Sequence, residues 1–394
     1  MDKKSILIFG VGELQKSIIN RAKLMGLYTI GIDPCIDAVC KEDVDVFEVV
    51  DGQDYEGTLA VARKYNVAAV VTAATDKPLV MMARIAKELG LRFYSEETAI
   101  WSTDKYQMKQ RFIEGGVPCA RGKIIKSVDE AKELDFPLIL KPRDNSGSRG
   151  VILCQDIHEL ATAMNETLQY TRLNSVLVEE FIEGTEFSIE SLHYNGKSKV
   201  IQYTEKRTTP FPYNVELGHI QPANISEVQK KEISLIIERI SKVMKFEHCP
   251  SHTELKINNR GIFVIETSPR LGGDYITSTL TPLSTGINVE DQLLHIALGE
   301  KVNTTSQNIQ YSGIRFFSFD VNNIITAIPD KKFVLSWPHV IDYTFNLSIN
   351  DSVQQITSSL SRYGHMILQA GNRESIDEAF DKYEKVIKDT CFKS

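Results

Sequence analysis

Residues 252 to 274 read HTELKINNRGIFVIETSPRLGGD. The runs 252–257 and 262–267 both have the composition of strands, and the Asn-Asn-Arg-Gly turn between them predicts an adjacent antiparallel pair. In this pairing Glu254 and Glu266 face one another on the same side of the sheet. Two carboxylates that close repel, unless a divalent cation lies between them, and Mg²⁺ takes such oxygen ligands while it holds substrate phosphates. Two solvated strand acids are the alternative interpretation.

Residues 138 to 151, LILKPRDNSGSRGV, lead from a strand into a loop of small residues. The strand delivers Lys141, and the loop around Ser146, Gly147 and Ser148 lets backbone N–H groups approach phosphate oxygens. The lysine precedes the glycines, so this is not the P-loop order GxxxxGK[ST]. The run indicates either a triphosphate site of another type or an ordinary turn.

Residues 176 to 190, VLVEEFIEGTEFSIE, place acidic residues beside apolar ones. One interpretation is a hairpin with solvated acids around the Glu-Gly-Thr-Glu segment at 183–186. The other is a hinge whose free backbone groups pair with an adenine edge, while a carboxylate accepts hydrogen bonds from ribose hydroxyls. The residues by themselves leave both interpretations open.

Residues 5 to 100 alternate short apolar runs with helical patterns. This alternation predicts βαβ units around a parallel sheet. We expect strands at 6–9, 28–32 and 68–71, and helices that end near residue 25 or cover about 55–65 and 78–89.

Gly10-Val11-Gly12 follows the first strand, and Asp33 closes the second, as in a dinucleotide site. Gln15 stands where the third glycine of that fingerprint is required. A sharp structural turn, or a turn that contacts a substrate other than a nucleotide, therefore competes with a nicotinamide site.

The rest of the chain mixes strands and helices, with loops rich in Gly, Pro, Ser and Thr at 142–150, 207–223 and 267–286. Such loops are where chemistry is expected. Beyond residue 305 a small α+β appendage is predicted. Its expected elements are β-like stretches at Ile314–Phe319, Phe333–Leu335, Tyr343–Leu347 and His365–Leu368, and a helix over about 374–389. We therefore expect three parts, at 1–100, 101–300 and 301–394.

Composition excludes several classes of protein. A length of 394 residues predicts two or three domains, and a net charge of -7 without a run of Lys and Arg argues against nucleic-acid binding. The six cysteines have no CxxC spacing, which argues against a zinc site or a disulfide framework. The first apolar run is too short for a signal peptide or a membrane span, so we expect a cytoplasmic protein.

Several of these runs together resemble the ATP-grasp superfamily in order and approximate spacing. The matching residues are Lys105, Lys141 with its Ser/Gly loop, the 179–182 run with Glu186, and the set Glu254, Glu266 and Arg270. The resemblance covers about residues 1 to 300, as a Rossmann-like preceding domain, a lid subdomain at about 115–185 and the ATP-grasp core. The strings His-Thr-Glu-Leu-Lys and Arg-Leu-Gly-Gly-Asp are similar to those of the L-amino-acid ligase and carbamoyl-phosphate-synthase-like branch.

The resemblance implies a role for each matching residue. The ATP phosphates would be bound by Lys105, Lys141, Ser146, Gly147 and Ser148. The adenine hinge would be Glu179, Glu180, Phe181 and Ile182, with Glu186 on the ribose. Mg²⁺, or Mn²⁺ in its place, would be held by Glu254 and Glu266, with Ser268 where many members carry an asparagine ligand. Arg270 would face the transferred phosphoryl group or a substrate carboxylate, beside Gly272 and Gly273. Lys206 and His219, from a loop that closes over the reacting centre, would stabilise the acyl phosphate.

The implied reaction is the ATP-dependent joining of a carboxylate to an amine through an acyl phosphate, with an amino acid as one substrate and release of ADP and phosphate. A carboxylase-like or purine-biosynthetic enzyme that activates bicarbonate or formate is the alternative. A nicotinamide-dependent oxidoreductase would rest on Gly10 and Gly12 alone, and a non-catalytic nucleotide-binding module on Ser268. The expected partners are a small-molecule carboxylate and amine, with no nucleic acid and no membrane, and the expected assembly is a homodimer.

Overall fold

The computed structural model describes residues 3–211, 213–307 and 310–392, and its strands form three sheets. The first sheet is parallel, in the order β3-β2-β1-β4. Its strands are β1 (Ser5–Phe9), β2 (Tyr28–Asp33), β3 (Val46–Val49) and β4 (Ala69–Val71). The helices of this part are α1 (Lys16–Leu24), α2 (Tyr55–Lys64), α3 (Leu79–Leu89), α4 (Glu96–Thr103) and α5 (Lys105–Glu114). The predicted βαβ alternation is confirmed; β3, a half-buried edge strand, has too weak an apolar signal to be anticipated.

The Gly10–Gly12 turn is closed by the side chain that replaces the third glycine. The amide of Gln15 accepts a hydrogen bond from the Gly12 N–H at 3.3 Å and donates one to the Ala73 carbonyl at 2.7 Å. The Asp33 carboxylate accepts from the N–H groups of Val11 and Cys35. The groups that a dinucleotide site would offer are used within the protein, which favours the structural turn.

The central sheet has eight strands in the order β13-β12-β9-β10-β11-β14-β16-β15, and all its pairings are antiparallel. The strands are β9 (Thr185–Tyr194), β10 (Lys197–Thr208), β11 (Glu216–Gln221), β12 (Cys249–Asn258), β13 (Gly261–Ser268), β14 (Tyr311–Phe316), β15 (Val340–Phe345) and β16 (Gly364–Ala370). Its helices are α7 (Glu227–Met244), α8 (Thr281–Thr285), α9 (Val289–Leu298), α10 (Lys331–Leu335) and α11 (Arg373–Cys391). The C-terminal strands thus continue the central sheet.

The expected β-like stretch Phe333–Leu335 is wrong, because these residues lie in α10. Asp330 caps this helix by accepting a hydrogen bond from the Phe333 N–H at 2.8 Å. Capping chemistry outweighs a short apolar run, which cannot distinguish a helix from a strand by itself.

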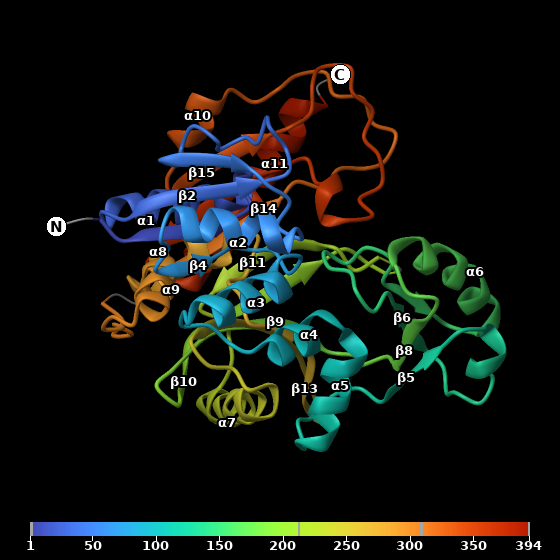
Figure 1. Ribbon diagram of the computed structural model, residues 1–394. Coiled ribbons are helices and arrows are strands. Elements are labelled where there is room, and N and C mark those ends of the chain that lie inside the picture. The colour runs from blue at the N-terminus through green and yellow to red at the C-terminus, as the bar shows by residue number, and fades with distance from the viewer. Residues whose placement is uncertain (1–2, 212, 308–309, 393–394) are drawn as a thin grey trace.

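The third sheet is antiparallel, in the order β5-β8-β6-β7. Its elements are β5 (Gly122–Ile125), β6 (Leu138–Lys141), β7 (Ile152–Cys154), α6 (Ile157–Thr167) and β8 (Val176–Glu180). It has a hydrophobic core of its own, and Figure 1 shows α6, β5, β6 and β8 set to the right of the central sheet. These elements lie within the expected lid, while the division of the chain at residues 100 and 300 stays a prediction.

The segment between β8 and β9 crosses from the third sheet to the central sheet. Gly184 in this crossover has a φ of 135°, and an added Cβ would lie 2.4 Å from the Ile257 carbonyl oxygen. The hairpin interpretation of residues 176–190 is therefore wrong, and the segment has the connectivity of a hinge.

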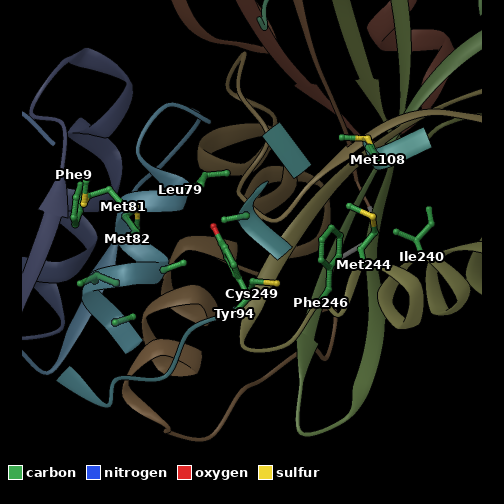
Figure 2. Close-up of a cluster of buried hydrophobic side chains, with 14 of the residues drawn as sticks. Phe9, Leu79, Met81, Met82, Tyr94, Met108, Ile240, Met244, Phe246 and Cys249 are labelled. Carbon is green, nitrogen blue, oxygen red and sulfur yellow. The ribbon is translucent and has the colours of Figure 1, made fainter. Parts of the chain in front are cut away.

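One hydrophobic cluster joins the first part of the chain to the central sheet. Figure 2 shows Met81 and Met82 of α3 on one side, and Met244 and Phe246 with Cys249 of β12 on the other. The apolar faces of the N-terminal helices thus pack the first part of the chain against the central sheet. None of the helices within the described ranges is both long enough and apolar enough to cross a bilayer.

We predict that Ile240→Ala lowers the stability of the protein by about 2–5 kcal/mol, because it opens a cavity in this shared cluster. Ile240 is 1% exposed on α7, whereas Leu235 of the same helix is 61% exposed. The control Leu235→Ala should change stability by less than about 0.5 kcal/mol. Urea unfolding followed by circular dichroism measures both, and equal midpoints for the two variants would contradict the assignment of this core.

Candidate active site

The predicted face-to-face pairing of Glu254 and Glu266 is confirmed, since the two residues are direct cross-strand partners on β12 and β13. The Lys105 ammonium, at the start of α5, forms an ion pair with Glu266. Ser268 lies two residues further along β13 and donates a hydrogen bond to Asp76 at 2.5 Å. The structure therefore gathers two carboxylates, one hydroxyl and one lysine at this edge of the sheet.

Lys206 of β10 lies among three carboxylates. Its Nζ is 2.8 Å from Glu186 Oε1, 2.8 Å from Glu254 Oε1 and 3.3 Å from Glu216 Oε1. Burial alone would lower the pKa of Lys206, but these three acids raise it well above its usual value. The ammonium group bridges these three carboxylates, so Lys206 holds the acids in place.

His252 bridges Glu254 to a second buried acid, Glu190. Its Nδ1 lies 2.6 Å from Glu190 Oε1, and its Nε2 lies 3.4 Å from Glu254 Oε1. Burial opposes protonation, but the Glu190 carboxylate outweighs it and raises the pKa of His252 to about 9. Burial would likewise raise the pKa of Glu254, yet Lys206 and His252 hold it well below its usual range, so Glu254 is ionised.

Gly272 lies against this pair. A Cβ at residue 272 would be 2.7 Å from His252 Nδ1 and 2.9 Å from Glu190 Oε2. Glycine is therefore required here by close packing, besides any contact that it makes with a substrate. Gly273 has more room, with Ala74 at 3.8 Å from the position of an added Cβ.

Arg270 is engaged with an acid from the N-terminal part of the chain. Its Nε and Nη2 donate to the two carboxylate oxygens of Asp76 at 2.7 and 3.0 Å, and its Nη1 donates to the Leu271 carbonyl at 2.9 Å. Burial would raise the pKa of Asp76, but Arg270 lowers it. This bidentate pair ties the loop after β4 to the loop after β13.

Lys141 at the end of β6 pairs with Glu179 of β8. Glu179 Oε2 lies 2.6 Å from Lys141 Nζ, and its Oε1 lies 2.7 Å from Lys109 Nζ. Burial would raise the pKa of Glu179, but the two lysines lower it. The Glu179 side chain therefore positions Lys141 and does not face an adenine base. The Glu180 side chain pairs with Arg121 at the surface.

At the hinge between β8 and β9, the group that is free to bind a base is a backbone N–H. The Phe181 N–H donates to the Pro137 carbonyl at 3.2 Å, whereas the buried Ile182 N–H makes no hydrogen bond to any residue that the structure describes. An unused, buried N–H group at this crossover fits the recognition of an acceptor on a ligand.

The loop after β6 is anchored to α5. The Lys105 N–H donates to the Arg143 carbonyl at 2.9 Å, and the Arg143 guanidinium pairs with Asp104, the N-cap of α5. Beyond this anchor, Gly147 and Ser148 have φ values of 71° and 56°, and the loop is largely exposed.

Two clefts meet this constellation. The first cleft, of about 560 Å³, is lined by Ser146 of the loop after β6 and by Lys105, Glu266, Ser268 and Asp76 among others. A second cleft, of about 640 Å³, is lined by Phe181, Glu186, Lys206, Phe211 and Lys256 among others. The first of these clefts reaches Glu266 and the loop after β4, and the second reaches the hinge and Lys206.

His219 of β11 is placed differently. Its ring is 2% exposed, its Nε2 lies 3.3 Å from Asp274 Oδ2, and its buried Nδ1 has no hydrogen-bond partner among the described residues. Asp274 is also bound by both Nη atoms of Arg362 at 2.7 and 2.6 Å. His219 lines neither cleft, but it is the direct cross-strand partner of Lys206 on β10.

Several charged residues of the site were missed from the sequence. Lys109 lies four residues after Lys105, on the same face of α5, so helical spacing could have found it. Asp76 follows a parallel strand at its carboxyl end, where ligands of such sheets gather. Glu190 gave no local signal, because its partnership with His252 arises from the pairing of β9 with β12.

Comparisons with known proteins agree with this architecture. A family model described as an ATP-grasp domain matches residues 134–278. Alanine–anticapsin ligase from Bacillus amyloliquefaciens is 26% identical over 245 residues, covering 55% of this chain and 51% of that protein. A crystal structure of an L-amino acid ligase from Bacillus licheniformis has a TM-score of 0.84 at 19% identity, over 98% of each chain.

A carboxylase structure is also similar. The biotin carboxylase domain dimer of Hydrogenobacter thermophilus 2-oxoglutarate carboxylase, in complex with MgADP, ADP and bicarbonate, has a TM-score of 0.73 at 20% identity. The match covers 96% of this chain and 89% of that chain. These identities show a shared fold and do not choose between ligase and carboxylase.

We predict that His252 stabilises the protein in a pH-dependent way. Because its pKa is raised from about 6.5 to about 9 in the folded state, its contribution is complete below pH 6.5 and is lost as the pH rises through 9. The stability difference between wild type and His252→Gln should therefore shrink by on the order of 3 kcal/mol over this window. Urea midpoints of the metal-free protein at several pH values measure it. His158→Gln, at an exposed site on α6, is the matched control; a difference that is independent of pH would contradict the assignment.

Proposed function

This chain belongs to the ATP-grasp superfamily, and from that premise we propose that it is an ATP-dependent carboxylate–amine ligase. It forms an amide or peptide bond through an acyl phosphate, with an amino acid as one substrate, and releases ADP and phosphate. The observation that carries this proposal is the opposition of Glu254 and Glu266 beside Lys105 and Ser268.

The donor set fits a magnesium ion. All of its atoms are hard oxygens, and Glu254 is ionised despite its burial. When bound there, Mg²⁺ would spread the negative charge of the ATP phosphates and of the transferred phosphoryl group. Glu254 and Glu266 would hold it, with the Ser268 hydroxyl near by, and Mn²⁺ is an alternative occupant. Among the described residues no cluster of three or more His, Cys, Asp or Glu side chains is arranged for a metal, so phosphate oxygens and water would complete the shell.

The nucleotide would lie along the two clefts. Its base meets the Ile182 N–H at the hinge, and its ribose hydroxyls donate to Glu186. Lys105, Lys141 and the backbone around Ser146, Gly147 and Ser148 receive the phosphates. Glu179 and Lys206 position other residues and do not contact the nucleotide themselves. Glu179 positions Lys141, and Lys206 positions Glu186 and Glu254.

The reaction then proceeds in two displacements. A carboxylate oxygen of the acid substrate attacks the γ-phosphorus, the bond to the β–γ bridging oxygen breaks, and ADP leaves. The amine nitrogen attacks the acyl carbon, the carbon–oxygen bond to phosphate breaks, and the amine releases a proton as the amide forms. The loop at 142–150 would close over bound nucleotide and exclude water from the acyl phosphate.

An amino-acid substrate is supported by the similarity to alanine–anticapsin ligase, whose name gives alanine as a substrate. The Arg270–Asp76 pair lies next to the phosphate cleft, but its two charges satisfy each other, so Arg270 would bind a substrate carboxylate by releasing Asp76. Bicarbonate or formate as the activated acid is the alternative.

Release of phosphate from MgATP, screened across pairs of amino acids with mass spectrometry of the products, tests the proposal. We expect release that depends on both an acid and an amine, and a product whose mass equals their sum less water. Release that depends on bicarbonate or formate alone would support the carboxylase-like alternative. Release with no added acid or amine would contradict both.

We further predict that Arg270→Ala lowers product formation about 100-fold or more, the scale for loss of one group that stabilises developing charge, while ATP binding is retained. Arg260→Ala, at the exposed β12–β13 turn, is the matched control. Calorimetric titration with ATP analogue and product assays separate the two properties. Unaltered turnover in Arg270→Ala would contradict the assigned role.

We also propose that the protein forms a homodimer. Sedimentation equilibrium, which measures the mass of the assembly in solution, tests this.

A further inference from the structure

Lys256 faces the nucleotide cleft from the floor of the central sheet. It lies two residues after Glu254 on β12 and is the direct cross-strand partner of Glu186 on β9. Alternation along a strand therefore places Lys256 on the same face as Glu254. The residue is 8% exposed, and it lines the cleft of about 640 Å³.

Two aromatic rings and one carboxylate surround its ammonium group. The Nζ lies 5.0 Å from the centroid of the Phe181 ring and 5.8 Å from that of Phe211. These two rings meet edge to face at 5.0 Å, so they hold the cation from neighbouring directions. The carboxylate is that of Glu186, whose Oε2 is 3.9 Å away.

Lys256 differs from the other lysines of the site in the contacts of its ammonium group. Lys105, Lys141 and Lys206 each form short ion pairs with an acid. Within the described residues, the Lys256 ammonium makes no hydrogen bond, because 3.9 Å to Glu186 is beyond hydrogen-bond distance. Glu186 also pairs with Lys206 at 2.8 Å, and it shares this cation with Glu216 and Glu254.

The Lys256 ammonium reaches the cleft with donors that the described residues leave unused, so a ligand in the cleft can accept from them in place of water. The structure therefore retains, inside the cleft, a charged donor that the protein itself does not satisfy.

We propose that Lys256 is a nucleoside-binding residue, whose ammonium group donates a hydrogen bond to the sugar edge of the bound nucleotide. This inference rests on the proposed function and deepens it. A nucleotide that reaches from the Ile182 hinge to Glu186 passes Lys256, which lies between Phe181 and Glu186. The acceptors on that edge of an adenine nucleotide are the purine N3 and the ribose 2′ oxygen, and either one satisfies the free donor.

Calorimetric titration of wild type and Lys256→Met with MgATP, 2′-deoxyATP and 3-deazaATP tests the proposal. Methionine keeps an unbranched apolar stem and removes the charge. We expect the variant to bind ATP about tenfold more weakly, as for loss of one charge-assisted hydrogen bond. Wild type should lose a similar factor with the analogue that lacks the accepting atom, and Lys256→Met should not show this loss. With 2′-deoxyATP, any loss caused by the missing hydrogen bond to Glu186 is common to wild type and variant, so the factor assigned to Lys256 is the difference between the two proteins. The analogue whose penalty is smaller in Lys256→Met than in wild type identifies the accepting atom.

Lys199→Met is the matched control, because it makes the same chemical change at an exposed position of the central sheet. It should leave all three affinities unchanged. Lys256→Arg keeps a donor and should retain discrimination between the analogues, which keeps the test valid should the methionine variant fail to fold. Equal affinity of wild type for the three nucleotides would overturn the inference, as would analogue penalties that are the same in Lys256→Met as in wild type. Failure of wild type to bind ATP would instead overturn the proposed function, and binding without ligation would overturn the ligase reaction alone.

Discussion

Two like charges placed opposite each other on neighbouring strands are the constraint on which the site depends. At cross-strand separation, near 5 Å, two carboxylates repel by about 3 kcal/mol at an effective dielectric constant near 20. The chain offsets this cost with cations on both sides, Lys206 and His252 for Glu254 and Lys105 for Glu266. Such an arrangement keeps Glu254 ionised and close to Glu266, which is the condition for holding a magnesium nucleotide.

Three ion pairs also join separate parts of the chain. Lys105 of α5 pairs with Glu266 of the central sheet, and Lys109 of the same helix pairs with Glu179 of the third sheet. Arg270 and Asp76 connect the central sheet to the loop after β4. Breaking a buried pair of this kind by removing one partner costs about 3–5 kcal/mol, because the other charge is left uncompensated. The ion pairs that neutralise buried charges at the site therefore also hold these parts of the protein together.

Patterns within short segments were readable from the sequence, and pairings across sheets were not. The βαβ alternation of residues 5–100 and the β12–β13 hairpin follow from local periodicity and a turn, and both agree with the structure. The 176–190 run was ambiguous, because a hairpin and a crossover between sheets have the same alternation of residues. The burial of Glu179 between Lys109 and Lys141 brings together α5, β6 and β8, and no spacing along the chain reports it. Lys256 belongs to the His-Thr-Glu-Leu-Lys string, but the sequence did not predict a role for it, because its free donors become apparent only once its neighbours are known.

The most direct measurement is a crystal structure of the protein with a non-hydrolysable ATP analogue and Mn²⁺, with diffraction data recorded at the manganese absorption edge. We predict an anomalous difference peak between Glu254 and Glu266, with oxygens of both carboxylates and of the analogue's phosphates about 2.0 to 2.3 Å from it. An ordered analogue with no peak there, or with the two carboxylates turned away from its phosphates, would contradict a magnesium nucleotide site at this carboxylate pair.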